Sequence, residues 1–326
     1  MFFFKTFVVC IKSLCYYVFM KNTAQEQKHK AQSFYMFLMM LAAFFWGTTF
    51  VAQSKGAEHV GAYTYLAGRS WISFFLMALM IQGIGFWQKK KKDHVPATKA
   101  RRRHIILGSL CCGFFLFAAS AAQQVGIAYT TTAKSGFLTA MYVVLVPVFS
   151  LFFGKKVRPL VFACVGLSVV GLYLLCMKDG YSLGFGDMIT LVSALLFTFQ
   201  ILCVSHFSHG VYGPTLAAGM FLVEAVLATV GMLWTEKLSL VSLRAATGSI
   251  LYAAVFSGCV AYTLQVVVQK HLSATLASIA MCCESVFSAL AGWIVLGQTL
   301  SGRELSGCVI IFVSILTASL VSTEKA

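Results

Sequence analysis

Charge is scarce in this chain, and acidic charge is the scarcest. Asp, Glu, Lys and Arg together make up 11% of the 326 residues, and only 10 residues are Asp or Glu. Hydrophobic residues make up 59%, and the mean hydropathy is +0.84. A soluble domain could not bury so much apolar surface in one core. The composition therefore predicts an all-α, polytopic membrane protein.

Motifs that would bind nucleotides or metals are also lacking. No GxxxxGK[ST] loop is present to hold phosphates, which excludes an ATP-driven pump. The 11 cysteines form no CxxC pair, so neither a disulfide framework nor a zinc site is indicated. His206-x-x-His209 has no Cys or carboxylate companion and is expected to be solvated. We expect no cofactor and no bound metal.

The positive charge is concentrated in loops. Of the 25 Lys and Arg, eight lie within Lys89–Arg103, and Lys155, Lys156 and Arg158 form a second cluster. No basic groove with interleaved aromatic residues is indicated, so no nucleic-acid partner is expected. Basic loops stay on the cytoplasmic side of a membrane, where they contact lipid headgroups. The clusters predict a multi-pass protein of the cell (inner or plasma) membrane with both termini in the cytoplasm.

Long apolar runs divide the chain into ten predicted spans. A helix needs about 20 apolar residues to cross a hydrocarbon core roughly 30 Å thick. The spans are expected near residues 34–54, 62–87, 105–127, 131–153, 158–177, 185–205, 214–234, 247–268, 274–296 and 304–321. Residues 1–33 form an N-terminal extension. Its first 20 residues either precede a later start or form an interfacial helix. A cleaved signal peptide is the least favoured alternative, because no A-x-A-like site follows the apolar stretch.

An internal repeat relates the two halves of the chain. At an offset of 141, Gln124-Val125 aligns with Gln265-Val266, Ala133 with Ala274, and Gly166 with Gly307. The alternative is chance matching between apolar segments. Five spans in each half, residues 34–177 and 183–321, force the second half to insert upside down. Inverted repeats around a midplane site are a common design of secondary transporters.

Several segments, in the same order along the chain, resemble the EamA-type branch of the drug/metabolite transporter superfamily. They are Leu41–Phe50 with its Trp46-Gly47 pair, Arg69, Thr132–Pro147, Gly184-Phe185-Gly186-Asp187 and Glu284–Gln298. The resemblance implies ten helices in two EamA repeats, and secondary transport or exchange of small metabolites without ATP hydrolysis. Gln298 stands where the family usually has Glu, which weakens any role for a carboxylate at that place.

Ionisable residues inside predicted spans are the first candidates for a site, because each costs roughly 3 kcal/mol or more without a partner or water. Four qualify: Arg69, Lys134, Glu224 and Glu284. We hypothesise that one carboxylate titrates or binds a substrate amine and that one cation holds a substrate carboxylate. Arg69 and Glu224 are expected at depths only about 5 Å apart. A purely structural ion pair between them is the alternative.

Polar and aromatic residues on apolar helices are further candidates. Gln124 and Gln265 are related by the repeat, so both are expected to face a central cavity. Trp46, Tyr142 and Tyr262 are expected to line a pathway for flat or aromatic cargo, with core packing or anchoring at the membrane interface as the alternative. Pro147 lacks a backbone N–H and should bend the fourth span.

The sequence therefore predicts a secondary transporter that moves a small organic metabolite, such as an amino acid, by alternating access. A gradient of protons or of a counter-substrate would drive it, and the oligomeric state stays open. The alternative is a non-transporting membrane protein, either receptor-like or an intramembrane enzyme.

Gly184–Asp187 matches the GxGD of intramembrane aspartyl proteases, which need a second aspartate on a facing helix. No other span contains Asp. We therefore expect that the protein is not an enzyme. Asp187 is expected near the N-terminus of a helix, where the helix dipole favours a negative charge.

Overall fold

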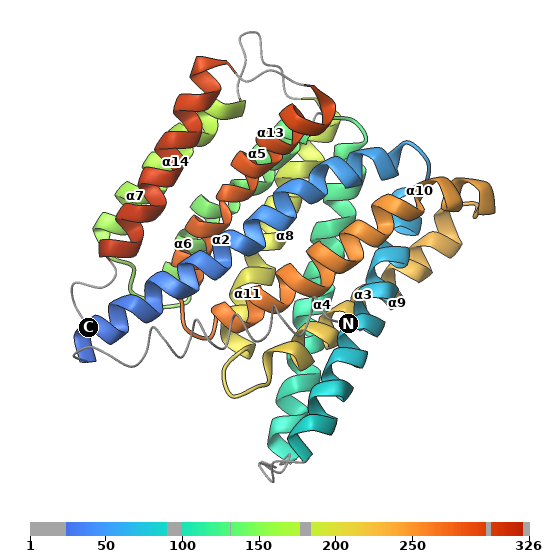
Figure 1. The fold of residues 1–326 in the computed structure, drawn as a ribbon, viewed down its shortest axis with the longest axis horizontal. Helices are drawn as coiled ribbons and strands as arrows, with labels where there is room; N and C mark the ends of the chain where they lie inside the picture. Colours follow the sequence, from blue (N-terminus) through green and yellow to red (C-terminus); the bar gives the residue numbers. More distant parts are fainter. Residues whose placement is uncertain (1–23, 90–98, 131, 177–183, 298–300, 322–326) are drawn as a thin grey trace.

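A computed structural model describes residues 24–89, 99–130, 132–176, 184–297 and 301–321, and every regular element in these ranges is a helix (Figure 1). The elements of the first half are α2 (Ala24–Ala57), α3 (Ala62–Lys89), α4 (Lys99–Ile127), α5 (Thr132–Ala140), α6 (Tyr142–Phe152) and α7 (Pro159–Cys176). Those of the second half are α8 (Phe185–Phe207), α9 (Gly213–Thr235), α10 (Leu240–Tyr252), η1 (Ala253–Ala261), α11 (Tyr262–Val268), α12 (Ala274–Met281), α13 (Cys283–Leu296) and α14 (Gly302–Val321). The first 20 residues, discussed above, lie outside the described residues.

Eight segments of the described chain are long and apolar enough to cross a membrane. They are Ala31–Ala57, Ala62–Gly83, Arg101–Ile127, Ser135–Phe152, Phe185–Phe207, Gly213–Thr235, Leu240–Val268 and Ala274–Val295. Eight of the ten predicted spans are thereby confirmed as apolar helical segments. The other two fall on α7, whose apolar stretch Pro159–Leu174 is shorter, and on α14.

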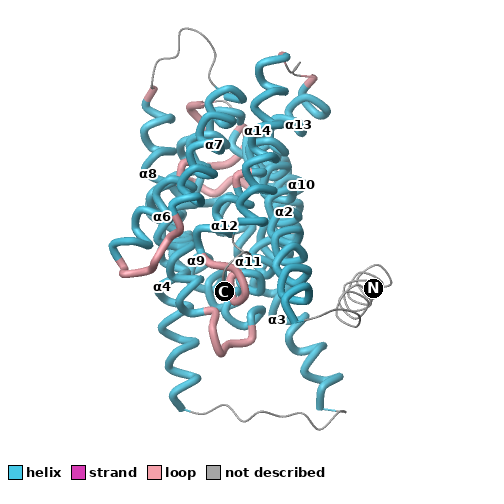
Figure 2. The backbone as a smooth tube through the Cα atoms, turned by 90° about the vertical axis from the view of Figure 1, so that its left-hand side faces the viewer, coloured by secondary structure: helices cyan, strands magenta, loops and turns pink. Residues whose placement is uncertain are grey.

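Each half packs mainly against the other half. The largest helix contacts join α3 to α9, α4 to α8 and α9, α7 to α14, and α2 to α13 (Figures 1 and 2). Small residues permit this close approach, as is usual for helices in membranes. At Gly171 of α7, an added Cβ would lie 2.9 Å from the carbonyl oxygen of Gly307 in α14. The core of the molecule therefore lies between the halves.

Two of the crossing segments are interrupted at positions that the repeat relates. The fourth predicted span breaks at Met141, between α5 and α6, and the ninth breaks at Cys282, between α12 and α13. At both breaks the amide of the interrupting residue and that of the third residue after it donate to carbonyls three residues back. Such bonds tighten the helix locally. α6 runs through Pro147, and the interruption of this span lies six residues before it, at Met141; the bend expected at Pro147 stays a prediction.

A third irregularity lies in the eighth predicted span. Residues Ala253–Ala261 form a π-helix, with α10 before it and α11 after it. Stretches of π-helix within α-helices are rare and often accompany functional sites. This stretch packs against α2 and α3.

Candidate functional site

A polar cavity lies at the centre of the bundle, where helices of both halves meet. The space that the centre of a water-sized sphere can occupy is about 30 Å³, and the total volume outside atoms, open solvent at the mouth included, is about 430 Å³. Its aromatic lining residues are Trp46, Phe50, Tyr142, Phe197 and Tyr262, and its charged ones are Arg69 and Glu284. Four amides complete most of the polar wall: Gln53, Gln123, Gln200 and Gln265. An apolar bundle thus encloses a space that can hydrogen-bond a small polar molecule.

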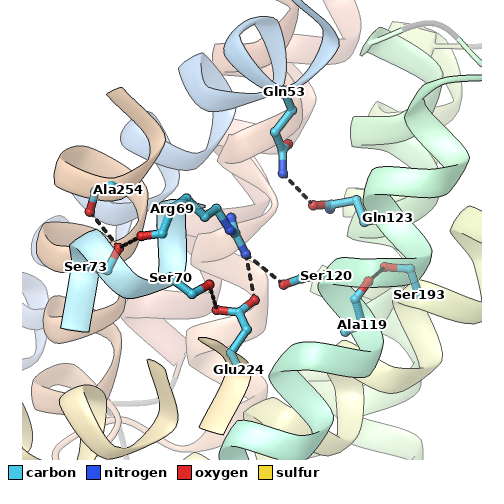
Figure 3. A network of polar contacts seen from close by, with 10 residues as sticks. All are labelled: Gln53, Arg69, Ser70, Ser73, Ala119, Ser120, Gln123, Ser193, Glu224 and Ala254. Carbon is cyan, nitrogen blue, oxygen red and sulfur yellow. Dashed lines mark hydrogen bonds and ion pairs between the residues drawn. The ribbon is translucent and has the colours of Figure 1, made fainter. Parts of the chain in front are cut away.

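Arg69 and Glu224 form a buried ion pair beside this cavity (Figure 3). The Arg69 guanidinium donates from Nη2 to Glu224 Oε1 at 2.9 Å and to Ser120 Oγ at 3.0 Å. The Ser70 hydroxyl donates to Glu224 Oε2 at 2.9 Å, so both carboxylate oxygens are satisfied. The pair that the predicted depths allowed, and that was the alternative to substrate binding, is present. It joins α3 to α9, and Ser120 extends the network to α4.

Glu284 has a different environment on the opposite wall. The Tyr142 hydroxyl donates to Glu284 Oε1 at 2.8 Å, and this bond joins the residues that follow the two helix breaks. Glu284 forms no ion pair with any side chain that the structure describes. Gly47 of α2 lies against the backbone here, since an added Cβ would sit 2.5 Å from the Glu284 carbonyl oxygen. Trp46 and Glu284 are therefore held on adjoining helices with almost no gap between the backbones.

Glutamine side chains are bonded to one another around the cavity. Gln53 donates to Gln123 at 3.3 Å, and Gln123 donates to Thr139 at 3.1 Å. Gln200 and Gln265 exchange hydrogen bonds of 3.3 and 3.1 Å. Amides that both donate and accept can exchange these partners for those of a ligand without leaving a buried group unpaired.

Two donors beside the cavity have no partner within the described part of the chain. Trp46 Nε1 and Arg69 Nε are both buried and unbonded. The Trp46 ring meets Tyr262 edge-on, with centroids 5.0 Å apart, so its position is fixed by packing. An unbonded buried N–H is unfavourable, and a ligand oxygen could satisfy it.

The structure places five of the eight predicted site residues on the cavity wall: Trp46, Arg69, Tyr142, Gln265 and Glu284. Glu224 lies behind Arg69. Gln124 is not among the lining residues, contrary to expectation, because its amide donates to the Gln53 carbonyl oxygen at 3.2 Å. Its neighbour Gln123 takes the place, since one residue turns a helix by about 100°. Lys134 belongs to α5, and its side chain lies outside the described residues.

Other lining residues could not be singled out from the sequence. Thr49, Thr139 and Ser257 are small hydroxyl residues of a kind common in all the helices. Gln200 carried a visible signal, since it is an amide within an otherwise apolar run, but packing between helices explained it equally well. Tyr262 differs from these residues, because it was expected to line the pathway and does lie on the cavity wall.

Asp187 lies away from the cavity and caps a helix, as expected. Its carboxylate accepts hydrogen bonds from the Gly184 amide at 2.9 Å and the Thr130 hydroxyl at 2.6 Å. His206 and His209 are exposed, which confirms their expected solvation. Within the described ranges, no three His, Cys, Asp or Glu side chains gather where they could hold a metal ion.

The loop between α11 and α12 carries two perturbed titratable groups. Burial, followed by Lys270 and His209, lowers the pKa of His271, whose ring stacks on Tyr35 with centroids 4.1 Å apart. Burial and the charge of Arg101 lower the pKa of Lys270, whose ammonium donates to the Val211 carbonyl oxygen. These groups lie outside the apolar segments and are separate from the cavity.

A helical bundle of apolar segments around a polar, charge-bearing cavity defines a multi-pass membrane protein, and comparison with known proteins makes it a membrane transporter. The EamA-like transporter family matches residues 33–177 and again residues 184–320. The chain belongs to this family.

Two individual proteins are similar over most of the chain. An uncharacterized transporter of Archaeoglobus fulgidus is 27% identical over 290 residues, which cover 86% of this chain and 84% of that protein. The crystal structure of another protein superposes with a TM-score of 0.70 over 89% of this chain and 97% of its own. Its sequence identity is 16%, so this likeness concerns the fold alone.

Proposed function

We propose that this protein is a secondary transporter that moves a small zwitterionic metabolite, such as an amino acid, across the cytoplasmic membrane by alternating access. Ten spans would form two inverted five-helix repeats, with both termini in the cytoplasm. The observation that carries the proposal is the cavity itself. Arg69 and Glu284 line the same cavity, and each half of the chain supplies one of them.

The packing of the helices supports the inverted repeat. If α2 corresponds to α8, and α4 to the α10–η1–α11 segment, then the α4–α8 contact should reappear between α2 and that segment, as it does. The α2–α13 contact reappears in the same way between α8 and the α5–α6 segment. The breaks at Met141 and Cys282 are separated by the same offset of 141 that aligns the sequences. Two halves related in this way can exchange their conformations, which opens the cavity to opposite sides.

The chemistry of the cavity favours a zwitterion. Glu284 has no cationic partner among the described side chains, so a substrate ammonium or a proton would supply the missing charge. Arg69 Nε and Trp46 Nε1 are unbonded donors, which suit a substrate carboxylate. The aromatic rings of Trp46, Tyr142 and Tyr262 would contact the apolar part of the cargo.

The Tyr142–Glu284 hydrogen bond would link substrate binding to movement at the two helix breaks. It connects the two helix breaks, and an ammonium bound to Glu284 would compete with the Tyr142 hydroxyl. Broken helices around a midplane site let the segments on either side of the break move separately. A proton bound at the same carboxylate would compete in the same way, which couples the cargo to a proton gradient.

Reconstitution into liposomes tests this function. The purified full chain is first screened by thermal shift against amino acids, nucleotides and sugars, because a ligand bound by the folded state raises its stability. The best ligand is then assayed as labelled cargo, with and without unlabelled cargo or a proton gradient on the other side. We expect saturable uptake that a gradient of either kind accelerates.

Two matched variants locate the site. Glu284→Gln should reduce uptake at least tenfold, whereas Glu58→Gln, which removes the same charge from an exposed position, should leave it unchanged. Equal uptake by Glu284→Gln and the unmodified protein would remove Glu284 from the mechanism. Uptake that no gradient or counter-substrate affects would contradict secondary transport.

A further inference from the structure

A second pocket lies at one end of the bundle, between a loop of the first half and a helix of the second. Its volume is about 680 Å³, open solvent included. One wall is the loop between α6 and α7, which contributes Lys155, Lys156 and Arg158. The other wall is the start of α12, which contributes Ser273 and Thr275. The central cavity shares none of these residues.

The charged residues that line this pocket are all basic. Three of its ten lining residues are Lys or Arg, and none is Asp or Glu. The two lysine side chains are exposed, while Arg158 is half-buried. The ammonium groups of Lys155 and Lys156 carry like charges side by side, and an anion bound beside them would be attracted by both.

The start of α12 adds the positive end of a helix. Ser273 is its N-cap, and the Ser273 hydroxyl accepts from the Leu276 amide at 3.3 Å. The first amides of a helix have no acceptor within the helix, and with the helix dipole they favour a negative group. Backbone amides at a helix start, combined with nearby Lys and Arg, are a recurrent arrangement for phosphate binding.

A buried hydroxyl points independently to a ligand. Ser150 lines the pocket and is 2% exposed, yet its Oγ has no hydrogen-bond partner in the described part of the chain. The Ser150 carbonyl oxygen accepts from the Lys155 amide at 3.0 Å, so the hydroxyl and the basic loop are held together. A ligand oxygen in the pocket would satisfy the Ser150 hydroxyl.

We propose that this pocket binds a phosphate group, either free or as the headgroup of an anionic phospholipid. Lys155, Lys156 and Arg158 would neutralise it, while the first amides of α12 and the Ser150 hydroxyl would donate to its oxygens. A phosphate held here bridges the α6–α7 loop to α12, which continues towards the break at Cys282. Bound phosphate would therefore hold the two halves in the arrangement seen in the structure, and its release would allow them to rearrange.

Thermal unfolding of the purified full chain tests the proposal without any transport assay. In detergent at constant ionic strength, we measure the shift in Tm with inorganic phosphate against chloride. A second series uses a short-chain phosphatidylglycerol against the matching phosphatidylcholine. We expect a saturable rise in Tm with at least one of the two phosphate probes. A rise with phosphatidylglycerol alone assigns the site to lipid, and a rise with inorganic phosphate assigns it to a free ligand.

Three variants show whether the rise comes from this pocket. Lys155→Gln/Lys156→Gln should weaken the apparent affinity at least tenfold, and Ser150→Ala should weaken it severalfold with little change in basal Tm. Lys237→Gln/Arg244→Gln removes the same charge from exposed positions outside the pocket and should keep the unmodified affinity. No rise with either probe, or an equal rise in Lys155→Gln/Lys156→Gln, overturns the proposal.

Discussion

Two buried carboxylates at the centre of this protein show how similar burial can accompany different roles. Glu224 is 0% exposed and Glu284 is 5% exposed, so burial does not distinguish them. Their partners do. Glu224 receives bonds from a guanidinium and a hydroxyl, whereas Glu284 receives one phenol hydroxyl and borders the cavity.

The comparison teaches that a buried charge should be judged by what neutralises it. The charges of Arg69 and Glu224 neutralise each other within the protein, so the pair fixes α3 against α9, and only Arg69 Nε keeps an N–H that a ligand could use. Glu284 is incomplete among the described residues, so it can accept an outside cation. Intramembrane charges that remain without a partner are the ones expected to take part in transport.

Breaking the complete pair should produce the largest effect on stability. Glu224→Gln keeps the shape of the side chain but leaves the Arg69 charge without its counter-charge. We expect a loss of about 3–5 kcal/mol of folding free energy, as for other buried pairs that lose one member. Thermal and denaturant unfolding in detergent measure it.

The double variant Arg69→Gln/Glu224→Gln sharpens this result. With both charges removed, most of the lost stability should return, because no unpaired charge remains. If the double variant is less stable than Glu224→Gln alone, the pair does not behave as a coupled unit and the contrast with Glu284 fails.

Crowding the backbone next to Glu284 should have the second-largest effect. In Gly47→Ala, the new Cβ would lie 2.5 Å from the Glu284 carbonyl oxygen, so α2 and α13 must move apart. We expect about 1–3 kcal/mol of destabilisation, typical of overpacking. Gly166→Ala is the control, because an added Cβ there meets nothing within 4 Å. Equal destabilisation by both variants would show that the close contact at Gly47 does not itself contribute to the folding free energy.

Neutralising the incomplete carboxylate should change stability least among the central variants. Glu284→Gln removes a charge that has no partner among described side chains, and its amide oxygen still accepts from Tyr142. We expect a change of less than about 1 kcal/mol, towards higher stability. A loss as large as that of Glu224→Gln would mean that Glu284 is neutralised within the protein, and the comparison would break.

The smallest expected effect is a pH dependence from the end of the bundle. The pKa of His271 is lowered in the folded protein, so the unfolded chain binds a proton more readily. Stability should therefore fall as the pH drops from above 6.5 through the folded pKa of His271. Unfolding measured between pH 5 and pH 8, a range of about three units around an ordinary histidine, reports it. His271→Asn should remove this pH dependence. If the pH dependence persists in His271→Asn but is lost in Glu284→Gln, it arises from Glu284 in the central cavity and not from His271.

The sequence predicted the helical segments because their signal is local. Apolar runs of the length of a membrane are visible without any contact information, and so is a charge inside one of them. The Arg69–Glu224 pair could be expected as well, since depth in the membrane follows from counting residues at a fixed rise.

Which side of a helix lines the cavity, and where a helix is interrupted, could not be predicted in the same way. Gln123 and Gln124 are adjacent and identical, and only the packing of α4 decides which one lines the cavity. The break at Met141 has no sequence signal of its own, and the only irregularity predicted for this span was a bend at Pro147. The matching break at Cys282 was not anticipated, because nothing in the residues around it disfavours a helix.

The π-helix at Ala253–Ala261 has a consequence for how this span can vary in length. A π turn takes up more residues than an α turn for a similar advance, so one residue can be deleted there while both flanking segments keep their places. Ser257, within this stretch, would then point in a new direction, whereas Tyr262 directly after it would stay. Related chains are expected to differ by single-residue gaps at this point, and those gaps would remodel one wall of the cavity without disturbing the rest.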